Sequence, residues 1–440
     1  MVAIADAIDL VALHQRSPDR YPFLLQSTAV SRQLGGYDIL FACPRERFEL
    51  RELGDLDSQG GFLKTLDDRW RAEYADVDTE TMPFTGGWFL YLGYELAGEI
   101  EPGLTLTPDP LLPVAFAVRC KAAVIRRHSD QACFLISEKD ADVCATTVSE
   151  DIAAAVNFEY SGLPDVSPTI TEEEPTIFTD AVVSAKEHIS AGDIYQANLS
   201  RQWMARFADP VEPESVYRSL CTQNPGPFAG LISYDDVHVV SSSPERLLAV
   251  TGRHISTRPI AGTRPRSDNA EHDQELLEEL INNPKERAEH VMLIDLERND
   301  LGRVCEAGTV VVNENMVIES YAHVHHIVSN VEGQLRADIT PGQAIAAVFP
   351  GGTITGCPKV RCMEIISELE DSPRGAYTGS FGYLNRNGDL DLNILIRTLV
   401  IHDDEVTLRA GSGIVADSEP EAELNETRAK AKGLLRALSP

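Results

Sequence analysis

Runs of apolar residues with β-branched and aromatic side chains dominate the first third of the chain. They occupy segments 86–100, 113–127 and 131–137, and each is bounded by Gly, Pro or Asp. Short apolar runs with such boundaries are typical of β-strands. We therefore expect the N-terminal part of the protein to be rich in strands.

Helical spacing of apolar residues appears only after this part. The first predicted helix is 178–192, with Thr179 as N-cap and Gly192 as its end. The second is 283–302, with Asn283 as N-cap and Pro284 at the first position. A last helix begins at Ser418, where Ser418 and Glu421 form a capping box. Between them, 194–207, 228–243, 246–259, 382–402 and 405–415 have strand patterns, with a hairpin turn at Asn387-Gly388. Strands and helices do not alternate regularly, which favours an α+β fold over a doubly wound sheet.

A composition change marks the boundary between the two parts. Residues 161–176 are rich in Pro, Ser, Thr and Glu, as linkers are. We expect a strand-rich part over 1–160, a linker over 161–176, and a catalytic part over 177–440, packed as one interlocked unit.

The charge balance excludes several classes of partner. Lys and Arg number 38 against 69 Asp and Glu, a net charge of −31, which argues against nucleic acid and against an anionic membrane. The N-terminus has no basic region or cleavage site of a signal peptide, and no apolar run reaches the length of a membrane span. The 8 cysteines show no zinc spacing. We expect a cytoplasmic protein with reduced thiols.

Two predicted helices carry glutamates three residues apart, Glu286 with Glu289 and Glu423 with Glu426. This spacing places each pair on one helix face. Four carboxylates that meet in space repel one another unless a cation joins them, and hard oxygen ligands suit Mg²⁺. Two solvated helix faces explain the same spacing, and spacing alone favours that simpler interpretation.

Other residues point to an anionic ligand and to proton transfer. Arg397 lies in an apolar run that predicts a strand interior, where it needs a carboxylate partner from the protein or from a substrate. Of the three histidines at 323, 325 and 326, strand alternation separates 323 and 325 from 326, so a single proton donor is favoured over a metal cluster.

The stretch "FPGGTITGCPKVRCMEII", residues 349–366, has the glycine spacing of a nucleotide loop, but Cys357 and Pro358 separate its last glycine from Lys359. It predicts a tight turn into a helix with Lys359 in the first turn. Such a helix end attracts a carboxylate as well as a phosphate.

Taken in order, these stretches resemble the chorismate-utilising enzymes. The motifs "SSSPERLL", "RPIAGTRPR", "AEHVMLIDLERNDLGRV", "HVHHIVSNVEG", "GAYTGSFGY" and "AGSGIVADSEPEAELNETRAKA" are collinear with that family over about 178–438. The resemblance implies a large mixed β-sheet core, sandwich-like and flanked by helices. It also implies a site for chorismate.

The resemblance assigns a role to each matching position. It implies that Glu289 and Glu426 bind Mg²⁺ directly, with Glu286 and Glu423 holding its waters, and that Arg397 and Tyr377 clamp the enolpyruvyl carboxylate. The backbone at Gly411, Gly413 and Thr353 lines the same pocket by resemblance. His326 matches the histidine near the departing C4 hydroxyl, Glu245 matches the acid of the family's "SPE" motif, and Lys359 adds positive charge.

Two positions bear on the reaction within this family. Water-using members carry a lysine base where this chain has Gln196, so the resemblance favours ammonia as nucleophile. The stretch "YQANLSR" is more like aminodeoxychorismate synthase component I than anthranilate synthase component I. Ala261, however, stands where many aminodeoxychorismate synthases have a lysine proposed to attack the ring, and alanine is the anthranilate synthase pattern. Amination at C4 is favoured, and anthranilate or 2-amino-2-deoxyisochorismate formation stays open.

The resemblance also implies partners and a second pocket. The chain has no recognisable glutaminase nucleophile, so a separate glutamine amidotransferase subunit is expected to supply ammonia. The stretches "YPFLLQST" and "NPGPFAG" resemble the tryptophan pocket of anthranilate synthases, which implies an amino-acid pocket that contains Leu25, Ser27, Pro227 and Phe228. Two ordinary core loops explain them equally well. A tryptophan-binding regulatory relative without activity is the non-enzyme alternative.

Overall fold

The computed structural model describes residues 1–4, 8–29, 35–53, 60–77, 79, 81–155, 162–267, 269–321 and 324–439. Its strands are β1 (Val2–Ile4), β2 (Phe23–Gln26), β3 (Tyr37–Leu50), β4 (Gly87–Leu92), β5 (Ala115–Arg127), β6 (Cys133–Ser137), β7 (Thr169–Glu172), β8 (Gln196–Arg206), β9 (Phe228–Tyr234), β10 (Val237–Ser243), β11 (Arg246–Thr251), β12 (His254–Arg258), β13 (Ile260–Pro265), β14 (Val311–Ser320), β15 (Val324–Gln334), β16 (Gly356–Cys357), β17 (Ser380–Asn385), β18 (Leu390–Asn393), β19 (Thr398–His402) and β20 (Glu405–Ile414). Its helices are α1 (Leu10–Arg16), α3 (Phe62–Glu73), α4 (Ala97–Ile100), α5 (Asp142–Ala155), α6 (Pro175–Ala191), α7 (Pro213–Gln223), α8 (Ala270–Asn282), α9 (Pro284–Gly302), α10 (Pro341–Val348), α11 (Lys359–Leu369) and α12 (Pro420–Arg436), with 3-10 turns η2 (Tyr94–Leu96) and η3 (Gly352–Ile354).

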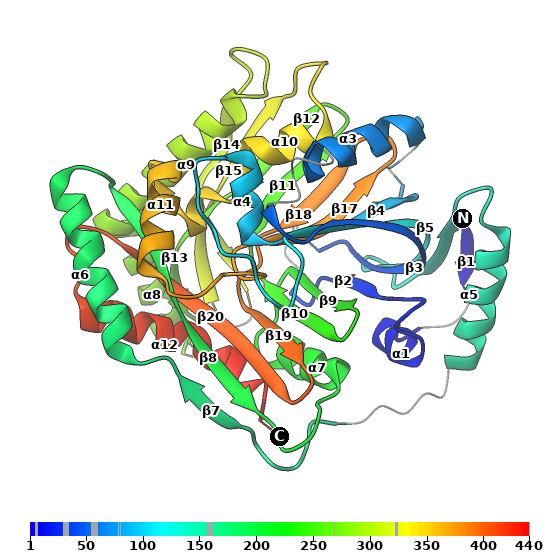
Figure 1. Ribbon diagram of the computed structural model, residues 1–440, viewed down its shortest axis with the longest axis horizontal. Helices are drawn as coiled ribbons and strands as arrows, with labels where there is room; N and C mark the ends of the chain where they lie inside the picture. Colours follow the sequence, from blue (N-terminus) through cyan, green and yellow to red (C-terminus); the bar gives the residue numbers. More distant parts are fainter. Residues whose placement is uncertain are drawn as a thin grey trace.

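One continuous β-network forms the centre of the fold (Figure 1), which confirms the α+β class. Pairing runs from β8 through β20, β19, β10, β9, β2, β3, β5, β4 and β17 to β18 and β11. We expected a mixed sheet, but every strand pair among the described residues is antiparallel. Hairpins and longer connections join these antiparallel strands, so no parallel crossover is needed.

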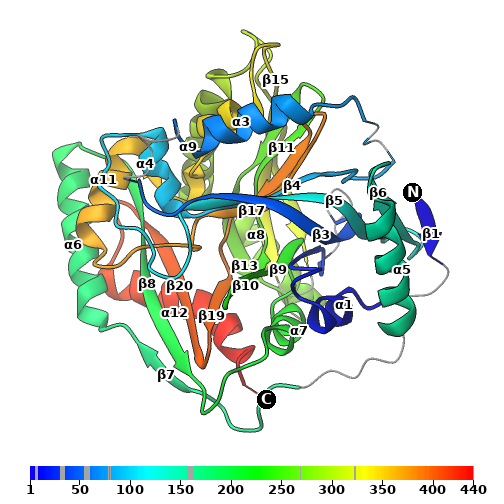
Figure 2. The same cartoon turned by 45° about the vertical axis from the view of Figure 1, so that its right-hand side comes forward.

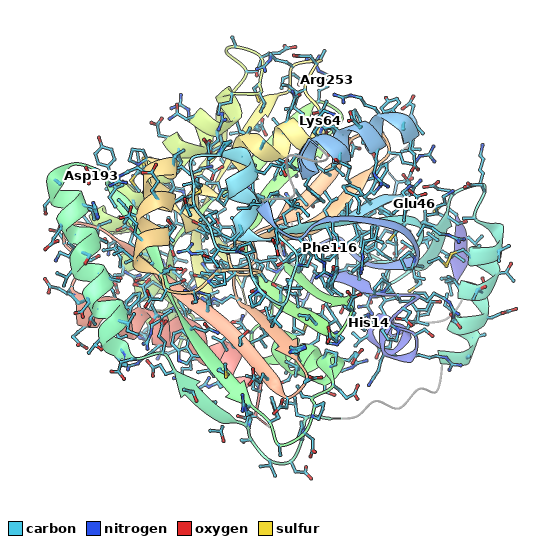
Figure 3. The ribbon with its side chains drawn as sticks, in the orientation of Figure 1. His14, Glu46, Lys64, Phe116, Asp193 and Arg253 are labelled. Atoms are coloured by element: carbon cyan, nitrogen blue, oxygen red, sulfur yellow. A yellow bond between two sulfur atoms is a disulfide. The ribbon has the colours of Figure 1, made fainter. Side chains whose placement is uncertain are left out.

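The sheet folds over an aromatic core. Phe23, Phe89, Phe116 and Phe381 come from β2, β4, β5 and β17, and the rings of Phe23 and Phe89 stack with centroids 4.0 Å apart. Figure 3 shows Phe116 deep in the molecule, whereas the labelled charged residues lie towards the periphery. Two further apolar clusters lie between the sheet and its helices, one under α1, α5, α7 and α12 and the other under α3, α9 and α10. This arrangement matches the expected sandwich flanked by helices (Figure 2).

Residues from both sequence halves pair within this sheet. Strand β2 pairs with β9, and β4 pairs with β17. The expected linker 161–176 contains β7, which pairs with β8, and the first residues of α6. No described helix has the length and apolar character that crossing a membrane requires.

The predicted helix ends were partly right. Helix α9 begins at Pro284 with the Asn283 side chain accepting from the Glu286 N–H at 3.3 Å, and α6 ends at Gly192 with φ +83°. Thr179 is not a cap, because α6 already begins at Pro175. Ser418 is not a cap either, since its hydroxyl accepts from the Val415 N–H at 3.0 Å and α12 begins at Pro420.

One cysteine pair contradicts the expectation of reduced thiols. Cys43 on β3 and Cys144 on α5 form a disulfide with a Cα–Cα distance of 6.2 Å. They are 101 residues apart, so sequence spacing carried no signal of the pairing. The packing of α5 against β3 brings them together.

Candidate functional site

A cavity of about 180 Å³ lies among β8, β13, β15, β20, η3 and α12. Its lining contains six residues predicted from the sequence, namely Glu245, His326, Thr353, Tyr377, Arg397 and Gly411. These residues come from positions up to 166 apart (Glu245 to Gly411), and the sheet brings them to one place. Gln196, Ala261, Gly413 and Lys359 were predicted for the same site but do not line the cavity.

Arg397 presents a guanidinium to this cavity without a protein counter-ion. It lies in the bend between β18 and β19 with φ +55°, not inside a strand as expected, and its carbonyl accepts from the Ser242 N–H at 3.1 Å. No hydrogen bond or ion pair engages its guanidinium within the described part of the chain. Burial lowers the pKa of Arg397. A buried, unpaired guanidinium is costly, and an anion from outside relieves that cost.

His326 lies on β15 with only 6% of its surface exposed. Its Nδ1 is 2.8 Å from the Thr263 hydroxyl on the neighbouring strand β13. Burial, with the charge of Arg397 adding to it, lowers the pKa of His326 to about 4. The imidazole is therefore neutral at pH 7, with one N–H to donate and one lone pair to accept.

The other histidines of this segment do not converge on His326. His325 points elsewhere, with Nδ1 2.7 Å from the Ser320 hydroxyl and Nε2 3.1 Å from Asp273. His323 lies outside the described residues. The separation of His325 from His326 follows the strand alternation expected from the sequence.

Glu245 is a buried carboxyl group at the cavity wall. It is 4% exposed, and the Thr353 hydroxyl donates to its Oε1 at 2.8 Å. Burial raises the pKa of Glu245 to about 8, with nearby Glu297 adding to the rise and Lys430 opposing it. At pH 7 the group therefore carries a proton that it can donate.

Lys359 does not supply positive charge to the cavity as expected. Its ammonium pairs with Asp300 on α9 at 2.5 Å and donates to the Val348 carbonyl at 2.9 Å. The first turn of α11 packs against the end of α9, so the charge is neutralised there.

Two basic residues that the sequence reasoning missed, Lys430 and Arg409, do line the cavity. Lys430 donates to the Gly411 carbonyl at 2.9 Å. Arg409 shares the buried carboxylate of Glu370 with Arg374, at 3.0 and 2.6 Å. Two guanidiniums on one carboxylate leave an excess positive charge beside the cavity. The position of Lys430, one helical turn after Glu426, was the available signal.

The four predicted metal ligands are held partly by protein cations. Arg264 pairs with Glu286 at 3.0 Å, and Lys430 pairs with Glu426 at 2.8 Å. Glu423 is 6% exposed, and Glu289 is half-buried. Within the ranges that the structure describes, no three His, Cys, Asp or Glu side chains gather to bind a metal. The carboxylate oxygens suit Mg²⁺ chemically, whereas their present arrangement satisfies two of them with Arg264 and Lys430.

A second cavity of about 340 Å³ contains all four residues of the predicted amino-acid pocket, Leu25, Ser27, Pro227 and Phe228. The Ser27 hydroxyl donates to the Pro227 carbonyl at 2.6 Å, which joins the two stretches that the sequence singled out. Ile39, Phe381 and Tyr383 extend the apolar part of its wall, and Arg246, Asp391 and Asn393 form a polar part. These stretches therefore form a real cavity.

Comparison with known proteins gives a consistent result. The profile of a family described as chorismate binding enzyme matches residues 22–436. An anthranilate synthase component I-like protein of Synechocystis sp. is 46% identical over 82% of this chain and 74% of its own length. Aminodeoxychorismate synthase component 1 of Bacillus subtilis is 40% identical over 86% of this chain and 80% of its own length.

A solved structure supports the same grouping. Anthranilate synthase component I from Streptococcus pneumoniae superposes with a TM-score of 0.81 at 28% identity, covering 91% of this chain and 92% of that one. The relatives carry names of both amination reactions, so the names alone do not separate them.

Proposed function

This chain belongs to the chorismate binding enzyme family, and from that premise we propose that it converts chorismate and ammonia to 4-amino-4-deoxychorismate and water. The observation that carries amination of chorismate is the unpaired guanidinium of Arg397 in a cavity that also holds neutral His326 and protonated Glu245. The choice of C4 rests on the sequence "YQANLSR" of β8. The product would serve 4-aminobenzoate and folate synthesis.

Positive charge in the cavity matches the two carboxylates of chorismate. Arg397 binds one of them, with the Tyr377 hydroxyl beside it as a second hydrogen-bond donor. The excess charge of the Arg374–Glu370–Arg409 group favours a dianion in a protein whose net charge is −31, and Lys430 adds to it once Mg²⁺ takes its partner Glu426. Holding both carboxylates fixes the ring and its C4 hydroxyl in one orientation.

The C4 hydroxyl needs a proton to leave as water. Neutral His326 donates a hydrogen bond to the departing oxygen. Glu245 carries a proton at pH 7 that it can donate to the departing oxygen. The Thr353 hydroxyl orients the Glu245 carboxyl group. As the C4–O bond breaks, the oxygen takes one proton and departs.

Nitrogen reaches C4 in two displacements in this proposal. Ammonia adds at C2 as the C4 hydroxyl departs, and a second ammonia then delivers nitrogen to C4 as the first group leaves. Ala261 provides no side-chain nucleophile, so no covalent lysine intermediate forms at that position. Gln196 provides no base to activate water, which disfavours the hydroxylated product.

We include Mg²⁺ as a cofactor and a separate glutamine amidotransferase as the ammonia source. Mg²⁺ would supply charge neutralisation for the ring carboxylate, with Glu289, Glu426, Glu286 and Glu423 as its ligands and outer ligands. Binding requires Glu426 to exchange Lys430 for the metal, and Glu286 to share its carboxylate with Arg264. Ammonium at high concentration should replace the amidotransferase.

Anthranilate synthase component I is the second candidate, and Ala261 favours it. It would stop after addition at C2 and eliminate pyruvate; release without elimination would give 2-amino-2-deoxyisochorismate. The deciding experiment incubates the protein with chorismate, Mg²⁺ and ammonium, with and without the lyase that acts on aminodeoxychorismate. We expect 4-aminobenzoate only when the lyase is present. Fluorescent anthranilate without lyase would assign the ortho reaction.

The second cavity supports an amino-acid ligand of the kind that the sequence resemblance implies. Its volume of about 340 Å³ and the apolar part of its wall suit a single aromatic side chain. Titration calorimetry with tryptophan tests this. Heat of binding to the wild-type protein but not to a Phe228→Asp variant would support it, and no heat would leave the cavity a structural remnant.

A further inference from the structure

Arg374 lies outside the lining of the cavity around Arg397, yet its side chain contacts two segments that form the cavity wall. Only 5% of its surface is exposed. Its guanidinium donates to the Ile354 carbonyl at 3.1 Å and to the Asn198 carbonyl at 2.7 Å. Ile354 ends η3, directly after Thr353, and Asn198 is on β8. One side chain therefore joins η3 to β8.

The other donors of this guanidinium are also used. Nε donates to Glu370 Oε2 at 3.0 Å, and Nη2 donates to Glu370 Oε1 at 2.6 Å. Nη1 also donates to the Thr378 hydroxyl at 3.4 Å. With the two carbonyls, all five N–H groups of the guanidinium have an acceptor. A lysine has a compact ammonium on a flexible stem and cannot contact all these acceptors at once. The geometry therefore needs an arginine here and not merely a positive charge.

The same arginine holds the turn that carries Tyr377. The Arg374 carbonyl accepts from the Tyr377 N–H at 2.9 Å, which closes a turn over 374–377. The guanidinium carbon lies 5.7 Å from the ring centroid of Tyr377 and 4.8 Å from that of Tyr94. The Arg374 N–H donates to the buried carboxyl group of Glu95 at 2.9 Å. Backbone and side chain of Arg374 thus both fix this turn.

We propose that Arg374 is a positioning residue of this cavity. Its guanidinium keeps Thr353 of η3 and Tyr377 in a fixed position relative to one another. The inference rests on the proposed chorismate site, in which Thr353 orients Glu245 and the Tyr377 hydroxyl faces a substrate carboxylate. A shift of either segment moves a group that acts on the substrate, and a displacement of about 1 Å can lower a rate about a hundredfold.

Arg119 on β5 provides a matched control. It is 4% exposed, and its guanidinium pairs with Glu73 and with Glu138 at 2.7 Å each. It also donates to the Gly87 carbonyl at 3.1 Å and to the Cys120 carbonyl at 2.9 Å. Neither this arginine nor its partners line the cavity. Both arginines therefore combine buried ion pairing with two carbonyl contacts, and only Arg374 holds the cavity wall.

The test compares Arg374→Lys with Arg119→Lys in the full chain, with chorismate, Mg²⁺ and ammonium. Each change keeps a positive charge beside the carboxylates but loses carbonyl contacts, so both variants should unfold at a lower temperature than the wild type. Arg374→Lys should lower kcat/KM for chorismate about 10–100-fold. Arg119→Lys should keep kcat/KM within about threefold of the wild-type value. Equal kcat/KM values for the two folded variants would overturn the proposal.

Coupling to Thr353 separates positioning from a general loosening of the fold. Thr353→Val removes the hydroxyl that donates to Glu245. Because Arg374 acts through η3, Arg374→Lys should lower kcat/KM at least about threefold less in the Thr353→Val background than in the wild type. Arg119→Lys should have the same effect in both backgrounds. Losses from Arg374→Lys and Thr353→Val that simply multiply would overturn the proposal.

Titration calorimetry with chorismate distinguishes this inference from the proposed function. Arg374→Lys should bind chorismate more weakly than the wild type and Arg119→Lys do, because Tyr377 moves. If the wild type binds chorismate but does not consume it with ammonium, the proposed amination is wrong, and the binding comparison still decides the role of Arg374. Unchanged chorismate affinity in Arg374→Lys would then overturn that role.

A second variant covers the case in which Arg374→Lys does not fold. Tyr94→Leu removes the ring beside the guanidinium, and Tyr94 does not line the cavity. We expect kcat/KM and chorismate affinity to fall about threefold or more in this variant, the loss of one cation–ring contact. Wild-type values of both would overturn the proposal.

Discussion

The cavity around Arg397 and the cavity around Ser27 both include residues of the β9–β10 hairpin or next to it, Glu245 just after β10 in the first and Phe228 on β9 in the second. The two cavities differ in whether their polar groups have hydrogen-bond or ionic partners within the protein. In the second cavity Arg246 forms two hydrogen bonds of 2.9 Å to Asp391, and Asn393 accepts from the Phe381 N–H at 2.9 Å. The protein itself satisfies these groups.

In the cavity around Arg397, key polar groups have no partner among the described residues and are available to a ligand. The guanidinium of Arg397 and the oxygen of Asn198 have no partner within the described residues, and Glu245 keeps a proton far above its ordinary pKa. Such groups lower stability, so they persist where a ligand completes them. The difference teaches that unpaired burial, rather than cavity size, marks the reactive site, since the second cavity is the larger of the two.

The largest expected effect is on metal dependence. Excess chelator should abolish turnover, and Glu289→Gln or Glu426→Gln should do the same, because both residues are proposed as direct Mg²⁺ ligands. Activity assays with chorismate and ammonium measure the loss, while thermal unfolding checks that the variants remain folded. Full activity in chelator would remove Mg²⁺ from the proposal.

Next in size is the contrast between two arginines. Arg397→Ala should weaken transition-state and substrate binding by about 2–5 kcal/mol, seen in kcat/KM, because a buried charge loses its substrate partner. Arg246→Ala removes an arginine that the protein already pairs with Asp391, and kcat/KM should change by less than about threefold. Equal losses of kcat/KM in both variants would show that pairing within the protein does not distinguish the two cavities.

A smaller effect concerns the pH dependence of stability. The folded protein holds the Glu245 proton up to pH about 8, whereas an unfolded glutamate loses it near its ordinary pKa of about 4.3. Between these values the folded state binds more protons, so the free energy of unfolding falls as pH rises, by at most about 1.4 kcal/mol per pH unit. Glu245→Gln should lose this contribution, while other buried carboxyl groups with a raised pKa, such as Glu95, keep theirs. Urea unfolding at pH 5, 6.5 and 8 compares the two proteins, and parallel profiles would refute the assignment.

The smallest effect on turnover should come from the disulfide. Reduction of Cys43–Cys144, or a Cys43→Ser variant, should lower the free energy of unfolding by about 2–5 kcal/mol, because the bond closes a long loop in the unfolded chain. Turnover in reductant should stay unchanged, since neither cysteine lines the cavity around Arg397. Thiol titration under denaturing conditions would show 6 free thiols before reduction if the bond forms.

The sequence predicted those features that depend on local chemistry. Asn283-Pro284 at the start of α9, Gly192 at the end of α6 and the Asn387-Gly388 turn were right because each residue acts on its own backbone. Thr179 and Ser418 were wrong since Pro175 and Pro420 begin the helices at other residues, and proline at the first position needs no side-chain cap.

Contacts between residues far apart in the chain could not be predicted from the sequence. Lys359 had the right motif, but nothing in the chain near it indicates that Asp300 neutralises it. The Cys43–Cys144 bond was missed for the same reason, because contacts between residues far apart in sequence have no local pattern. Lys430 differs, since its place one helical turn after Glu426 was a local signal that was not used. The six cavity residues were found through a family resemblance that carries such contacts.

The pairing of β4 with β17 also bears on how the protein is made. Leu92 is opposite Ser380, so 288 residues must follow Leu92 before its partner leaves the ribosome. At about 5–20 residues per second, the edge of β4 that pairs with β17 waits roughly 15–60 s for its partner, although β5 follows early enough to cover the other edge. Phe89, which ends fully buried, lacks its ring contact with Phe381 during that time. Nascent chains should therefore depend on chaperones until the ribosome has finished nearly the whole protein.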